Sequence, residues 1–218
     1  MIKRIFKTLI ALVLMLVIII TVYITLAKLI EMSIPDDYIF YQVYNGFYLK
    51  VFTLLLAEII ILPFTDGLKN LVSKKFYLAS IVAFLLFSYL FITSVITVGQ
   101  DYIFVKSPIN PGGKTYEYKD VTKVKAYVND KKFNFFSNRN RWDFVYEIEL
   151  NNKSYDLALP TLNPVSEYDE STSFTEINDL DKNLMNLGIE KESSKENIEK
   201  NEMNKESADL FLEIVNRK

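Results

Sequence analysis

The chain has 218 residues and a formal net charge of −2, and it contains neither cysteine nor histidine. Disulfides, thiol nucleophiles and thiolate metal sites are therefore excluded, and the commonest general base and transition-metal ligand is missing. The sequence has no phosphate-binding glycine loop and no nucleophile elbow. We expect no catalysis, no metal site and no cofactor. A membrane enzyme that uses carboxylates is the least favoured hypothesis for the function.

Charge is distributed unevenly along the chain. Residues 1–100 carry 8 basic and 5 acidic side chains, residues 101–141 carry 9 and 4, and residues 142–218 carry 8 and 18. A nucleic-acid-binding protein would be more uniformly basic, so nucleic acid is not expected as a partner. The long apolar stretches end near Gly99, which predicts a transmembrane domain over residues 1–99 and a water-soluble half after it.

Three apolar segments predict transmembrane helices at about 5–30, 47–65 and 76–98. The first is preceded by basic residues but exceeds the roughly 7–15 apolar residues of a signal peptide, so it is predicted to be an uncleaved signal anchor. The middle segment contains Lys50 and Glu58, and a re-entrant or interfacial segment is the alternative there.

Positive residues in the short loops predict the orientation of these helices. The N-terminus has three and the 66–75 loop has three more, whereas the 28–46 loop has one beside three acids. We expect a multi-pass protein of the cell membrane, with its N-terminus in the cytoplasm and its C-terminal domain outside. If the middle segment fails to cross, the C-terminal domain is cytoplasmic instead.

In the soluble half, Trp142–Leu150 alternates apolar and polar side chains, which is typical of a half-buried strand. Asn151-Asn152 suits a two-residue turn, because Asn tolerates positive φ. A second strand, Lys153–Leu159, would then give the apolar pairs Ile148–Tyr155, Tyr146–Leu157 and Phe144–Leu159.

Further strands complete a predicted meander of about six antiparallel strands. Val128 and Ala126 should face Phe133 and Phe135, and strands at 102–106 and 115–118 should be separated by Pro111-Gly112-Gly113.

A helix is predicted next, with Ser173 and Glu176 as a capping box, and with Gly188 and Ile189 as a Schellman ending. Residues 190–206 predict a flexible charged linker, and residues 208–215 predict a terminal amphipathic helix.

The run Asp101-Tyr-Ile-Phe-Val-Lys-Ser, the segment Gly113–Val124 and the hairpin strands that contain Tyr146 and Tyr155 resemble bacterial PH-like domains. The resemblance implies a bent antiparallel sheet or small sandwich over residues 100–189 with a capping C-terminal helix, and it implies no catalytic residues. Such domains often follow membrane hairpins and are usually cytoplasmic, unlike the orientation above. The predicted fold is therefore α-helical in the membrane and α+β outside it, with a charged linker and terminal helix over 190–218.

Glu58 is the first candidate functional residue. A central charge in a membrane helix costs roughly 2.5–3.5 kcal/mol on insertion scales, so Glu58 should face the bundle interior. It could relay protons or cations; alternatively, it is a neutral acid hydrogen-bonded to a hydroxyl such as that of Thr21, Thr25, Ser88 or Thr93.

Basic residues of the early strands are the second candidates: Lys123, Lys125, Lys131, Lys132, Arg139 and Arg141. On one face they would bind anionic lipid headgroups or an acidic protein partner. Alternatively, they are solvated and balanced by the acidic segments that follow. Glu147 and Asp156, opposite each other in the predicted hairpin, are more simply solvated acids than a calcium site.

Together these features predict a non-enzymatic integral membrane protein whose PH-like domain is an interaction scaffold or sensor. Its partners would be the lipid bilayer and a protein or anionic lipid headgroups. A transport or proton-linked accessory role centred on Glu58 is the alternative, and it would require an oligomer because three helices enclose little space.

Overall fold

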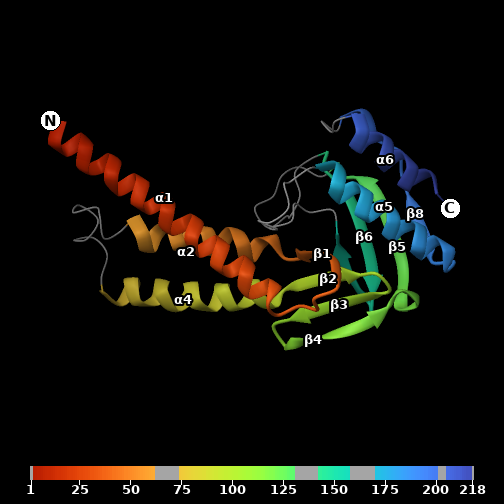
Figure 1. The fold of residues 1–218 in the computed structure, drawn as a ribbon, viewed down its shortest axis with the longest axis horizontal. Helices are drawn as coiled ribbons and strands as arrows, with labels where there is room; N and C mark the ends of the chain where they lie inside the picture. Colours follow the sequence, from red (N-terminus) through yellow and green to blue (C-terminus); the bar gives the residue numbers. More distant parts are fainter. Residues whose placement is uncertain (1, 62–73, 131–141, 158–169, 201–204, 218) are drawn as a thin grey trace.

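The computed structural model describes residues 2–61, 74–130, 142–157, 170–200 and 205–217 (Figure 1). The helices are α1 (Ile2–Glu31), α2 (Gly46–Ile61), α4 (Lys74–Thr93), α5 (Glu170–Asn186) and α6 (Lys205–Asn216). The strands are β1 (Tyr38–Val43), β2 (Val95–Gly99), β3 (Tyr102–Ser107), β4 (Asn110–Glu117), β5 (Val121–Val128), β6 (Phe144–Leu150), β7 (Lys153–Asp156) and β8 (Glu190–Ser193). Two short 3-10 turns are η2 (Tyr118–Asp120) and η3 (Ile198–Lys200).

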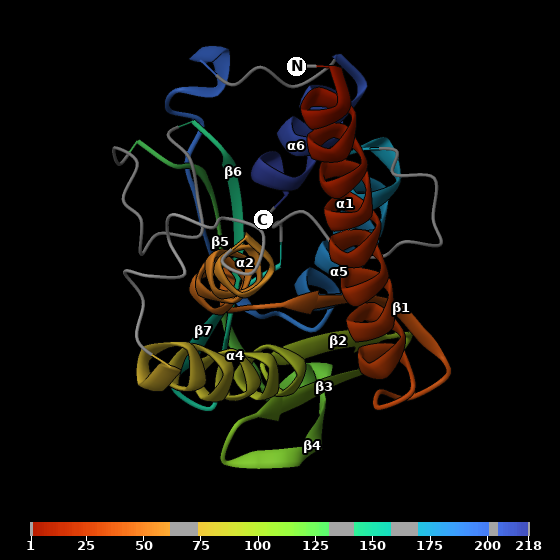
Figure 2. The same ribbon diagram turned by 90° about the vertical axis from the view of Figure 1, so that its left-hand side faces the viewer.

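The strands form two four-stranded sheets. Sheet A has the order β1-β2-β3-β4, and sheet B has the order β7-β6-β5-β8. Helices α1, α2 and α4 extend from one end of the sheets, and α5 and α6 lie at the other side of the molecule, beside sheet B (Figures 1 and 2).

Strands β1 and β2 hold the two ends of the α2–α4 pair together. They are antiparallel neighbours, with Tyr41 opposite Thr97 and Val43 opposite Val95. The pairing continues beyond the strands, because the Tyr44 N–H donates to the Ser94 carbonyl at 3.1 Å. Helix α2 begins just after β1, and α4 ends just before β2. The helices therefore leave and return at neighbouring positions of one sheet.

Sheet A has buried side chains on both faces, in strands β1, β2 and β3. One face contributes Phe40, Ile96 and Ile103 to a core shared with sheet B, α5 and α6. The other face contributes Tyr41, Val95 and Phe104 to a second core with α1, α2 and α4. In that second core, the Phe52 ring of α2 stacks on Phe84 and Phe91 of α4 at centroid distances of 5.0 and 6.0 Å. Sheet A thus connects the helices to the rest of the protein.

The prediction of three transmembrane helices is wrong. Among the described residues, one helical segment is long and apolar enough to cross a membrane, the 19-residue segment Lys75–Thr93. The 16 residues of α2 give about 24 Å of helix, which is less than the roughly 30 Å of a hydrocarbon core. The last turns of α1 pack in the protein interior, since Leu26, Ala27 and Ile30 are buried.

Two segments near the helices have a different structure from the one that the sequence predicts. The helix expected to reach residue 98 ends at Thr93, because Val95–Gly99 forms the fully buried strand β2. A strand covered on both faces is a continuous apolar run, which resembles the end of an apolar helix. Strand β1 lies in the 28–46 segment, for which a loop is predicted.

The hairpin of β6 and β7 is confirmed in its predicted register. Ile148 lies opposite Tyr155, and the Leu157 N–H donates to the Tyr146 carbonyl at 2.8 Å. Asn151 and Asn152 have φ values of 53° and 60°, as the two-residue turn requires. Leu159 lies outside the described residues.

The predicted Schellman ending of α5 is also confirmed. Gly188 has a φ of 74° and donates to the Met185 carbonyl at 2.9 Å, while the Ile189 N–H donates to the Leu184 carbonyl at 3.3 Å. The start of the helix differs, because α5 begins at Glu170 and so Ser173 and Glu176 lie inside it.

The strands before β6 differ from the predicted meander. Val128 and Ala126 of β5 face Phe144 and Tyr146, and the predicted partners Phe133 and Phe135 lie outside the described residues. The turn between β3 and β4 is made by residues 108 and 109, so Pro111-Gly112-Gly113 lies within β4. Gly113 has a φ of 77° and lies under the Phe104 ring, where a Cβ would approach a ring atom to 2.1 Å.

Part of the predicted charged linker is a strand. β8 pairs in parallel with β5, which makes sheet B mixed rather than antiparallel. Its charges alternate with a period of two. Glu190 and Glu192 bind Lys123, and Lys191 points to the interior. Strands are usually recognised in a sequence by alternating apolar and polar side chains, and β8 has ion-paired charged side chains in these positions instead.

Candidate functional site

Helix α4 carries an apolar surface that the described part of the protein does not cover. Six large side chains of this helix are between 45% and 62% exposed, and we call them the α4 surface: Phe76, Leu78, Val82, Leu85, Leu86 and Tyr89. Only 17% of the apolar segment is buried, whereas a core helix would be mostly buried. No charged residue lies between Phe76 and Thr93.

Helix α1 adds further exposed apolar side chains on the same side of the sheets. Seven of them are 43% to 57% exposed: Val13, Leu16, Val17, Ile18, Ile20, Ile24 and Leu29. Uncovered apolar area of this extent is rare on a monomer in water, and it is typical of a surface that meets a membrane or another protein.

Glu58 lies on α2 and bonds to α4. Its Oε1 accepts a hydrogen bond of 2.8 Å from Ser80 Oγ. The hydroxyls suggested by the sequence are used otherwise, since those of Thr21, Thr25, Ser88 and Thr93 each donate to the carbonyl four residues earlier. The Glu58–Ser80 contact ties the two helices together, and the serine is the hydroxyl partner that sequence reasoning missed.

Lys123 is the candidate basic residue whose partners are best defined. Its Nζ lies 3.0 Å from Glu190 and 2.6 Å from Glu192, and these hydrogen bonds, that to Glu192 first, raise the pKa of Lys123. Lys125 lies beside Glu147 on one neighbouring strand and Glu192 on the other. Lys131, Lys132, Arg139 and Arg141 lie outside the described residues.

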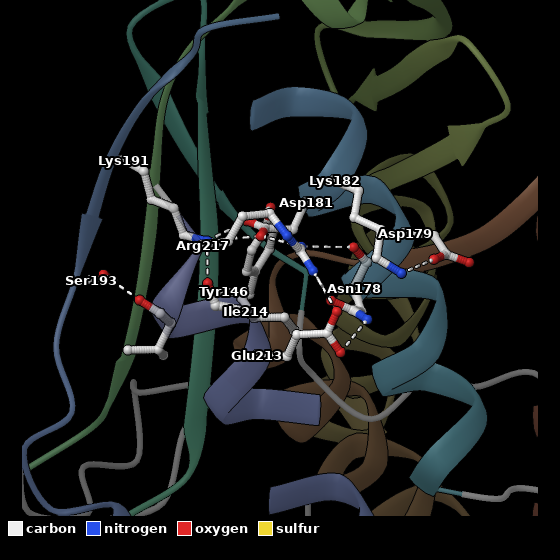
Figure 3. A network of polar contacts seen from close by, with 11 residues as sticks. Tyr146, Asn178, Asp179, Asp181, Lys182, Lys191, Ser193, Glu213, Ile214 and Arg217 are labelled. Carbon is white, nitrogen blue, oxygen red and sulfur yellow. Dashed lines mark hydrogen bonds and ion pairs between the residues drawn. The ribbon is translucent and has the colours of Figure 1, made fainter. Parts of the chain in front are cut away.

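A buried polar network joins α5 and the end of α6 to strands β6 and β8 of sheet B (Figure 3). Asp181 is fully buried on α5 and accepts hydrogen bonds from Lys191 Nζ at 2.6 and 2.8 Å and from Arg217 Nη1 at 2.6 Å. The Tyr146 hydroxyl also donates to Asp181, at 3.1 Å. Arg217 further donates to Asn178 Oδ1 at 2.6 Å and to Glu213 Oε1 at 3.0 Å. The Asp181 carboxylate on α5 thus binds side chains from β6, from β8 and from the residue that follows α6.

Burial dominates the electrostatics of this network. It lowers the pKa of Lys191, and the hydrogen bonds to Asp181 oppose that shift. Burial also raises the pKa of Tyr146 well above its ordinary value, and the Asp181 charge adds to this effect. The sequence held a signal for the network: Asp181 occupies the apolar stripe of α5, four residues after Ile177 and three before Leu184.

Glu147 and Asp156 lie opposite each other in the β6–β7 hairpin, as expected. Across the described residues, no group of three or more acidic side chains is placed to hold a metal ion.

Comparison with known proteins finds no matching protein family, no similar curated protein and no similar solved structure. The resemblance to PH-like domains therefore stays a prediction.

We expect Asp181→Ala to lower the free energy of unfolding by about 3–5 kcal/mol, because it leaves Lys191 buried without its carboxylate. Urea unfolding followed by circular dichroism measures the change. Asp179→Ala is the matched control on the same helix. It removes an exposed ion pair with Lys182 and should change the free energy by less than about 1 kcal/mol. Equal losses in the two variants would contradict a structural role for the network.

Glu176 should make stability depend on pH. Its half-buried position raises the pKa of its carboxyl to about 7, from 4.5 for an ordinary glutamate. The folded state therefore binds the proton more tightly, so stability due to this group is full below pH 4.5 and is lost as the pH rises through 7. We expect Glu176→Gln to have nearly the same melting temperature as the wild type at pH 4.5 and a higher one at pH 8. A difference that is constant across this range would contradict the assignment.

Proposed function

We propose that this protein is a membrane-anchored interaction module. In this proposal α4 is inserted in a lipid bilayer with α2 beside it, and a locally thinner bilayer accommodates the shorter α2. Sheets A and B with α5 and α6 form a domain at the membrane surface that binds a protein or lipid partner. The observation that carries the proposal is the α4 surface, an uncharged and mostly exposed helix face.

The length and ends of α4 support a lipid environment. Its 19-residue apolar segment gives about 28 Å of helix, which is close to the thickness of a hydrocarbon core. Lys75 is exposed at one end, where a basic side chain would meet headgroups. At the other end α4 passes into sheet A, so that the anchor and the domain are continuous.

The pairing of β1 with β2 bears on the sidedness of the domain. These strands precede and follow the α2–α4 pair, so the proposal has both ends of the pair on the same side of a bilayer. Because sheet B shares a core with sheet A, the proposal has sheet B on that side too. If α4 crossed the bilayer and α2 did not, β1, which precedes α2, and β2, which follows α4, would lie on opposite sides of the membrane. The two strands could then not pair.

An interaction role for the domain is supported by the edge of sheet A, which has no further strand beside it among the described residues. β4 is the last strand of the sheet, and most of its side chains are exposed. An exposed edge strand offers unpaired backbone groups to a partner strand. The alternative proton-linked role of Glu58 gains no comparable support, because its described partner is a single serine hydroxyl.

Replacing the α4 surface should release the protein from membranes. Leu78, Val82 and Leu85 form one stripe, at i, i+4 and i+7. We expect the wild type to float with liposomes and the triple variant Leu78→Asp, Val82→Asp, Leu85→Asp to stay in the aqueous fraction. Each carboxylate costs about 2.5–3.5 kcal/mol near the bilayer centre. All three side chains are about 60% exposed, so the fold should survive, as circular dichroism would show.

Leu187→Asp is the control, because it replaces a 53% exposed leucine outside the helical anchor and should leave flotation unchanged. A wild-type protein that forms a defined oligomer in water and does not bind liposomes would contradict the proposal. The α4 surface would then be covered by another copy of the chain.

Single cysteines test the sidedness, since the chain has none of its own. Asp36 is exposed before the α2–α4 pair, and Asn152 is exposed after it. We expect Asp36→Cys and Asn152→Cys to react with a membrane-impermeant maleimide from the same side, measured in intact and inverted vesicles of an expression host. Labelling from opposite sides would contradict the proposed insertion, because β1 and β2 could not pair across a bilayer.

A further inference from the structure

Two apolar side chains near the base of the helices are far more exposed than the others. Ile109 is 96% exposed and Met32 is 84% exposed, whereas no other large apolar side chain of the described residues exceeds 62%. Isolated apolar side chains on a surface are common, so exposure alone does not indicate a function, and the position of each side chain in the fold has to be considered.

Ile109 lies in the turn between β3 and β4, and this turn is attached to α4. The Tyr89 hydroxyl, itself part of the α4 surface, donates to the Pro108 carbonyl at 2.9 Å. Within the turn, the Asn110 N–H donates to Ser107 Oγ at 3.2 Å. The turn therefore lies against the last part of α4, and Ile109 is exposed next to the place where that helix meets sheet A.

Met32 follows α1 and is placed by a buried lysine. Lys106 is 3% exposed, and its Nζ donates to Ser33 Oγ at 2.7 Å. The carbonyl of Lys106 accepts from the Tyr44 hydroxyl at 3.2 Å, next to the start of α2. Lys106 lies two residues before Pro108, so the loops of Met32 and Ile109 are both fixed at the end of sheet A from which the helices leave.

We propose that Met32 and Ile109 insert into the interfacial layer of a lipid bilayer and set the domain against the membrane surface. This inference rests on the proposed insertion of the α2–α4 pair. The two side chains belong to loops beside different helices, Met32 after α1 and Ile109 against α4. A bilayer surface that surrounds the helices would contact both Met32 and Ile109. Through its hydrogen bond to Pro108, Tyr89 joins the turn that contains Ile109 to the α4 surface, and tyrosine is enriched at the membrane interface.

Fluorescence quenching in nanodiscs tests the contact with the full-length protein. Single variants Met32→Cys and Ile109→Cys are labelled with an environment-sensitive fluorophore, and the nanodiscs contain lipids spin-labelled at the headgroup. Lys119→Cys is the aqueous control, because Lys119 follows the far end of β4, an eight-residue strand that spans about 26 Å. Leu85→Cys reports on insertion of α4 through lipids spin-labelled in the acyl chain.

We expect the labels at positions 32 and 109 to show blue-shifted emission, quenching by headgroup-labelled lipid and protection from iodide, and the label at 119 to show none of these. If the labels at 32 or 109 behave like that at 119 while that at 85 is quenched by chain-labelled lipid, this inference is overturned and the membrane anchor stands. If the label at 85 also remains accessible to iodide, the proposed function fails as well.

Discussion

The pairing of β1 with β2 is the interaction on which the arrangement of the protein depends. It closes the base of the α2–α4 pair and makes both strands part of sheet A. Side chains of sheet A pack on the helices at one face and on sheet B, α5 and α6 at the other, so the helices and the domain share one sheet rather than a linker. This sheet fixes the position and tilt of the domain relative to α4.

Local chemistry made parts of the fold predictable. The β6–β7 hairpin follows from two asparagines that accept positive φ and from one register that pairs apolar residues, and the end of α5 follows from Gly188. In both cases the deciding contacts lie within a few residues along the chain. The positions of the three apolar segments were predictable as well, but hydropathy does not reveal whether an apolar side chain meets lipid or the protein's own core. Ile30 is fully buried and Leu85 is exposed, although both lie in apolar runs.

Contacts distant in sequence account for what the sequence did not predict. β1 and β8 are defined by partners on other segments: β1 by β2, and β8 by Lys123 and Asp181. Glu58 could be singled out from its apolar surroundings, but its partner Ser80 depends on how α2 lies against α4. The Asp181 network had one local signal, a charge on an apolar helix stripe, while Lys191 and Arg217 come from elements beyond α5.

The base of the α2–α4 pair also bears on how the chain folds. β1 and β2 are separated in sequence by both helices, so their pairing is a non-local contact with a loop-closure cost. Once α2 lies against α4, Val43 and Val95 are brought to neighbouring positions and most of that entropy has already been lost. Formation of sheet A, and with it the core shared with sheet B, is then expected to follow assembly of the helices. The α2–α4 pair would then serve as a template on which the rest of the domain is completed.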